Sequence, residues 1–304
     1  MKRLLAVLCQ ISALVALATH AENWCQRFPE DAILVGYVNV KGVRAIPQIE
    51  ALLDGQDRLS RMATAARKQM AVDLETVTDV WFGVSPTNGP LAVLHGDYNL
   101  TTIRGVAGTA QSLRVSAPAG AEFALAETNP NRGTMVAFLS PREAVVGRAA
   151  QVEAFLANRV AEKQHPRHQD LAGFDAPTHL VQCALLAFPQ GKRLLPAAIA
   201  EQIALLTLAI DGTDSADLLL TIQPSRPEMA APLGTWCQST LELLRLLPPE
   251  HLALLNETQR ALLDSAQASA VPQGVAIRAN LPLVLIQGHL GRKLGSAHPT
   301  DPPP

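Results

Sequence analysis

Short apolar stretches recur along the whole chain, and many are too short and too rich in β-branched residues to be helices. Two pairs of these stretches are each joined by a turn. The first pair covers residues 77–85 and 90–97, with a turn at 86–89, and the second covers 203–211 and 216–223. In the second pair apolar residues recur at every other position, as in a strand that is buried on one face. The pattern predicts two β-hairpins.

The remaining periodicity predicts a chain in which strands and helices alternate. Further strands are expected at residues 31–40, 113–116, 123–127, 135–139, 144–146, 179–188 and 275–281. Helix-spaced apolar positions predict helices at 43–70 with a break near Gly55, at 100–110, 149–160, 194–202, 227–247 and 250–266, and a last one that starts at Pro282.

The predicted elements follow the same order in each half: strand, helix, hairpin, helix, later strand and final helix. Residues 161–177 lose the apolar periodicity and gather charge, Pro and Gly, which is typical of a linker. We therefore predict an α+β protein of two similar lobes, residues 22–160 and 178–294, each a mainly antiparallel sheet with helices packed on one face. The windows 77–99 and 203–225 match without a gap, which favours an internal duplication.

The two ends of the chain differ from the lobes. Residues 1–21 have two basic residues followed by an apolar run and a small-residue ending, the pattern of a secretory signal peptide. Cleavage is expected after Ala21, with Ala18 as the alternative. The run is shorter than the roughly 20 residues that cross a bilayer, so no transmembrane segment is expected in the mature chain. The signal peptide predicts that the mature protein is located in the periplasm or outside the cell. At the other end of the chain, residues 295–304 are expected to be a disordered tail.

Composition narrows the function. Only 4% of the residues are aromatic, with three Trp and two Tyr, which disfavours sites that stack bases or sugars. Removing Lys2 and Arg3 with the leader takes the formal charge from -2 to -4. The mature chain would have no net positive charge to attract a polyanion, so we do not expect it to bind nucleic acid.

The cysteines are odd in number after cleavage. Of the 4 in the chain, Cys9 lies in the leader, which leaves Cys25, Cys183 and Cys237. A disulfide between Cys183 and Cys237 is one alternative in an oxidising compartment, and two buried free thiols are the other. No CxxC pair is present to suggest a redox or zinc site.

One candidate catalytic pair stands at the end of the first hairpin. His95 and Asp97 are two residues apart, so in a continuing strand they share a face and His95 could act as a general base oriented by Asp97. The alternative is that both side chains face solvent while Leu94 and Tyr98 pack inward. No Gly-x-Ser-x-Gly motif supplies a nucleophile.

Two clusters contain metal-ligating residue types. His165, His168 and Asp170 lie within six residues, but their spacing and Pro166 differ from a helical zinc motif. Three carboxylates stand in the second hairpin turn without the order of a calcium loop; they are Asp211, Asp214 and Asp217. A polar linker and an ordinary acidic turn are the preferred interpretations. No phosphate loop or dinucleotide motif is present, so no cofactor is expected.

The chain loosely resembles uncharacterised exported bacterial proteins with an α+β fold. The resemblance rests on the strand start Pro29-Glu30-Asp31-Ala32 and on the hairpin ending Gly96-Asp97-Tyr98. It would cover most of the mature chain, and it implies the fold. Such families carry no assigned activity, so it implies nothing about mechanism.

The predicted helices at 227–247 and 250–266 each have an apolar face. Trp236, Leu241, Leu244 and Leu247 form the first, and Leu252, Leu255 and Leu262 the second. An antiparallel helix pair packed on the sheet is the preferred interpretation, and a groove that binds a partner is the alternative.

These observations favour an exported, non-catalytic binding or interaction protein of the periplasm or cell exterior. Its partner would be a protein or small molecule that the sequence does not name, and a homodimer is compatible with it. The alternative from another class is a hydrolase that uses His95 and Asp97.

Overall fold

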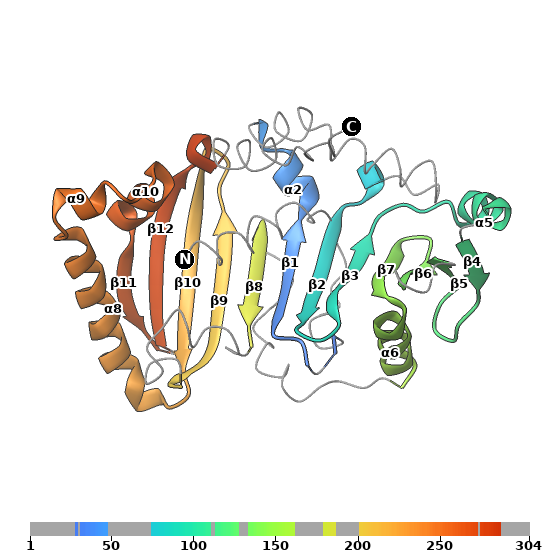
Figure 1. Ribbon diagram of the computed structural model, residues 1–304, viewed down its shortest axis with the longest axis horizontal. Coiled ribbons are helices and arrows are strands. Elements are labelled where there is room, and N and C mark those ends of the chain that lie inside the picture. Colours follow the sequence, from blue (N-terminus) through green and yellow to red (C-terminus); the bar gives the residue numbers. More distant parts are fainter. Residues whose placement is uncertain are drawn as a thin grey trace, which may run out of the picture.

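The fold is built on one 12-stranded sheet with the strand order β11-β12-β10-β9-β8-β1-β2-β3-β7-β6-β5-β4 (Figure 1). All neighbouring strands in it are antiparallel. The computed structural model describes residues 28–29, 31–47, 74–110, 113–127, 133–161, 179–186, 201–272 and 274–286. This confirms the predicted α+β class.

The strands match the predicted stretches closely. Their bounds are β1 Leu34–Asn39, β2 Asp79–Ser85, β3 Gly89–His95, β4 Leu113–Ser116, β5 Phe123–Glu127, β6 Thr134–Ser140, β7 Glu143–Arg148, β8 Val181–Leu185, β9 Ile203–Asp211, β10 Ser215–Pro224, β11 Gln267–Val271 and β12 Gly274–Pro282. The α-helices are α2 Val40–Arg44, α5 Leu100–Thr109, α6 Ala149–Val160, α8 Ala230–Arg245, α9 Pro249–Leu252 and α10 Glu257–Ser265, with short 3-10 turns at Leu74–Thr76 and Pro227–Met229.

The two predicted lobes are joined edge to edge in this sheet. β1 of the first half pairs with β8 of the second, and β1-β2-β3 and β8-β9-β10 then run outward in opposite directions from that junction. β1 has four buried residues in a row, so it is apolar on both faces and needs a strand on each side. The matched order, with α5 after β3 and α8 after β10, fits the proposed duplication.

One face of the sheet, called face A here, carries α5, α8 and α10. Ile103 and Ala107 of α5 pack over Phe123 and Phe138, whose rings stack with centroids 4.9 Å apart. Leu233 and Cys237 of α8 pack over β10 and β12. Burial of these apolar side chains is the main stabilising term for the helices, because in proteins most helix stability comes from packing of the apolar face.

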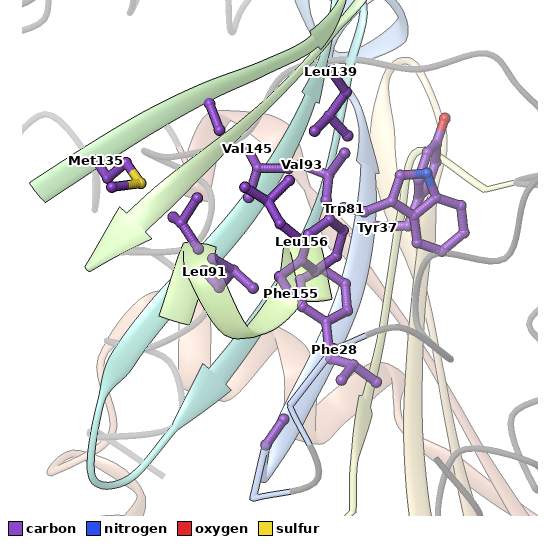
Figure 2. Packing of buried hydrophobic residues seen from close by; sticks show 14 of the residues in the cluster. Phe28, Tyr37, Trp81, Leu91, Val93, Met135, Leu139, Val145, Phe155 and Leu156 are labelled. Carbon is purple, nitrogen blue, oxygen red and sulfur yellow. The ribbon is translucent and has the colours of Figure 1, made fainter. Parts of the chain in front are cut away.

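The opposite face, face B, is covered in the first half by α6. Phe155 and Leu156 of α6 join Phe28, Tyr37 and Trp81 in a cluster that Figure 2 shows from close by. The prediction that all helices lie on one face is therefore too simple. The strands of the first half are apolar on both sides, as the burial pattern of β2 shows, so each face needs a cover.

Several elements differ from the prediction. β11 was not predicted, because Gln267–Val271 is small and partly polar rather than β-branched. The predicted helix 250–266 is divided, since Asn256 and Gln259 form a capping box that starts α10 afresh. β12 continues through Pro282 and the helical turn begins only at residue 283.

Asp31, which belongs to the Pro29-Glu30-Asp31-Ala32 motif, stabilises the turn of the first hairpin. Gly89 has a φ of +84°, which a three-residue hairpin loop of this kind requires. The Asp31 carboxylate accepts hydrogen bonds from the hydroxyls of Ser85 and Thr87. Partial burial opposes ionisation, but these donors outweigh it and lower the pKa of Asp31.

Cys183 and Cys237 are both free thiols, so the disulfide alternative is wrong. Each belongs to a different apolar cluster: Cys183 lies in β8, between β1 and β9, and Cys237 lies on the buried side of α8. Burial raises the pKa of the Cys183 thiol to about 12, which leaves it inert.

Among the described helices, none combines the length and the apolar content that a bilayer crossing requires.

Candidate functional site

The most unusual chemistry lies at the open end of the β2–β3 hairpin. Asp79, the first residue of β2, is directly opposite His95, the last residue of β3. Their side chains meet on face B, with 2.5 Å between His95 Nδ1 and Asp79 Oδ1. Both are buried, with side-chain exposures of 4% for His95 and 0% for Asp79.

A third strand extends the pair toward solvent. Glu143 begins β7 and is opposite His95 on the other side, with 3.8 Å between Glu143 Oε1 and His95 Nε2. Arg159 of α6 lies 3.9 Å from the second Glu143 oxygen and donates to the Gly120 carbonyl at 3.0 Å. The imidazole therefore lies between two carboxyl groups, and among the described residues only the Glu143 carboxylate lies within 4.0 Å of an arginine.

Burial dominates the electrostatics of this cluster. It raises the pKa of Asp79 from 3.8 to about 9, so the carboxyl holds a proton at neutral pH. Its Oδ2 atom has no hydrogen-bond partner among the described residues. Burial, and after it the nearby Asp79 carboxyl, also raise the pKa of Tyr37 and Tyr98. The Asp79–His95 pair can therefore hold a proton and share it between the carboxyl group and the imidazole.

The predicted partnership of His95 with Asp97 is not present. β3 ends at His95, so the two-residue period does not continue, and Asp97 lies exposed beyond a bend at Gly96. A Cβ on Gly96 would lie 2.9 Å from the Val77 backbone, which explains the glycine at this bend. The alternative, in which His95 faces solvent, also differs from the structure, because both faces of β3 are covered.

Sequence reasoning missed Asp79, although a signal was present. The turn places Ser85 opposite Gly89, and counting six residues outward along each strand gives Asp79 and His95. Hairpin register alone pairs the two residues once the turn is located. Glu143 could not be found this way, because its strand joins β3 from a distant part of the chain.

Polar residues also occupy this end of the sheet in the second half, on face B. Asp211 of β9 pairs with Asp217 of β10, which in turn pairs with Asn280 of β12. Asn280 donates to Asp217 at 2.6 Å and to Ser215 at 2.7 Å. This end of the sheet is thus lined by hydrogen-bonded polar side chains, buried in the first half and more exposed in the second.

The candidate metal ligands do not converge within the described part of the chain. Asp211 binds His179 and the Leu180 amide instead, Asp217 binds Asn280, and Asp214 stands exposed in the turn. The described residues contain no group of three or more ligating side chains that could hold a metal ion. His165, His168 and Asp170 lie outside the described residues.

Two shallow hollows occur on the described surface, and neither reaches His95. One, of about 390 Å³, is lined by α5 residues such as Arg104 together with Glu122. The other, of about 350 Å³, lies between α8, α9 and α10 and includes Arg245 and Asp264. His95 lines neither of these two hollows.

A second unusual feature is a group of exposed leucines between the end of α8 and the segment after α9. We call Leu243, Leu244, Leu246 and Leu254 the leucine patch; their exposed fractions are 67%, 40%, 79% and 80%. Leu244 belongs to the predicted apolar face of the first helix, whereas the other three were not singled out. The inner side of α8 packs on the sheet, as the preferred interpretation predicts, and its C-terminal end leaves leucines exposed.

Comparison with known proteins finds structures of similar fold and does not indicate an activity. No family model matches the chain, and neither does any curated protein. Crystal forms III and IV of TP0453 each align with a TM-score of 0.52 at 10% identity; form III covers 90% of this chain and 99% of its own. Crystal form I aligns with a TM-score of 0.51. At this identity the likeness concerns the fold alone.

Proposed function

We propose that the chain is an exported, non-catalytic interaction protein that binds its partner through the leucine patch. The observation that carries this is the exposure of four large aliphatic side chains within residues 243–254, from the end of α8 to the segment after α9. Single exposed leucines are ordinary, but a group of them is typical of surfaces that a partner covers. The inner side of α8, with Leu233 and Cys237, is already buried by its packing on the sheet.

The burial of His95 supports this proposal over the hydrolase alternative. A general base must come within hydrogen-bond reach of its substrate. His95 is 3% exposed, and its ring already has a carboxyl group on each side. The cluster is better explained as a polar network that fixes the register of β2, β3 and β7 at one end of the sheet.

Site-specific photo-crosslinking would test the interaction. A photoreactive phenylalanine at Leu246, in cells that make the full chain, is expected to give one defined adduct whose second component is identified by mass spectrometry. The same probe at Val160, which is 58% exposed on α6, is the matched control. Equal adducts at both positions, or none at Leu246, would contradict the proposed surface.

Export has a separate test. When the full chain is made in a bacterium, intact-mass measurement of the periplasmic fraction is expected to show loss of residues 1–21. Replacing Ala21 with arginine should retain the leader or move cleavage to follow Ala18. An uncleaved chain confined to the cytoplasm would exclude the proposed location.

A further inference from the structure

We propose that the partner is a second copy of this chain, joined through the edge strand β11 so that two sheets become one. This deepens the proposed function and rests on it, because part of the leucine patch would be covered in the same contact. β11 ends the sheet beyond β12, and among the described residues no strand pairs with its outer side. Gln267, Ser269 and Ala270 are exposed.

The composition of β11 distinguishes it from a protected edge. Its sequence, QASAV, contains no charged residue and no proline. Natural edge strands usually carry such residues because an open row of N–H and C=O groups pairs readily with other strands. The opposite edge, β4, is four residues long and carries Arg114 in its centre. Only β11 combines an open edge with an uncharged sequence.

The register of the hairpin suits pairing with itself. Val271 and Gly274 close the β11–β12 turn, so alternate residues from Val271 bond to β12, and Ala268 and Ala270 direct their N–H and C=O groups outward. A two-fold axis at Ser269 places Ala268 of one copy opposite Ala270 of the other. All the outward groups of these residues are then satisfied, and no like charges face each other in the strand pair.

The position of α8 provides the remaining contact. α8 lies on face A over β11 and β12, at the same end of the sheet in Figure 1. With strands about 4.8 Å apart, two helices so placed would lie roughly 10 Å apart across the axis. That is the distance at which helices pack through their side chains.

The flank of α8 that would meet its copy is apolar. Arg245 marks the opposite flank, since its guanidinium donates to the Leu263 and Ala266 carbonyls at the end of α10. At 100° per residue, Trp236 and Leu243 of α8 lie about half a turn from Arg245, away from α10. Leu243 of the leucine patch would thus be buried by the second copy.

Charge-swap complementation at Ser269 would test the proposal. The full chain is expected to sediment as a dimer at tens of micromolar concentration, and Ser269→Lys or Ser269→Glu alone to weaken dimerisation about tenfold or more, because like charges would meet at the axis. An equimolar mixture of the two variants should restore a dimer. Val115→Lys on β4, where Val115 is 38% exposed, is the control and should remain dimeric.

Each outcome decides a different point. A monomeric wild type, or a dimer that neither Ser269 variant weakens, overturns the β11 contact. If the crosslinking probe at Leu246 then still captures one defined protein of another sequence, the interaction function stands with a different partner. If the chain is monomeric and the probe captures nothing, both proposals fail. Recovery in the mixture shows that the single variants were folded.

Discussion

Replacing Asp79 with asparagine is expected to stabilise the protein increasingly as the pH rises from about 5 to 8. The folded-state pKa of Asp79, about 9, lies above its ordinary value of 3.8, so between these values the folded protein binds a proton that the unfolded chain has released. The wild type loses stability as the pH rises through this window. Asparagine does not titrate, so the variant gains up to about 1.4 kcal/mol per pH unit over the wild type.

Urea unfolding of both proteins at several pH values would measure this difference. Asp214→Asn, in the exposed hairpin turn, is the control and should follow the wild-type pH dependence. If Asp79→Asn gains nothing between pH 5 and 8, then Asp79 is ionised in the folded protein and pairs with a His95 imidazolium. The buried cluster would then be an ion pair rather than a proton store.

Replacing Gly36 with alanine is expected to destabilise the protein by about 3 kcal/mol, lowering its melting temperature by roughly 6–12 °C. Gly36 lies in β1, between Phe82 of β2 and Cys183 of β8. A Cβ there would stand 2.5 Å from the Phe82 ring and 2.8 Å from the Gln182 carbonyl oxygen. Because one of these contacts is with the β8 backbone, β1 and β8, which join the two halves, would have to move apart.

Gly105→Ala is the matched control for this substitution. Gly105 lies exposed in α5, and a Cβ there would meet nothing within 4 Å. This change should stabilise the protein by up to about 1 kcal/mol, since alanine is the better helix former. Thermal unfolding of both variants gives the comparison. Equal melting temperatures would mean that the junction at β1 adapts to the added methyl group.

The leucine patch and the buried cluster differ in how far sequence could predict them. Leu244 and Leu247 were recognised on an apolar helix face, but the helical period does not show which leucines the sheet covers. Leu246 is exposed because α8 ends at Arg245. Whether an apolar side chain is core or interface depends on the elements around it, and those are set by tertiary packing.

The sequence by itself determined the α+β class, the two hairpins and most strand and helix bounds, because side-chain periodicity and turn residues act locally. Only the tertiary structure decided that both halves share one sheet, that Cys183 and Cys237 stay apart, and that His95 also meets Glu143. Each of these depends on strand pairing or helix packing between segments distant in the chain. Local periodicity carries no record of such pairing until the register is known.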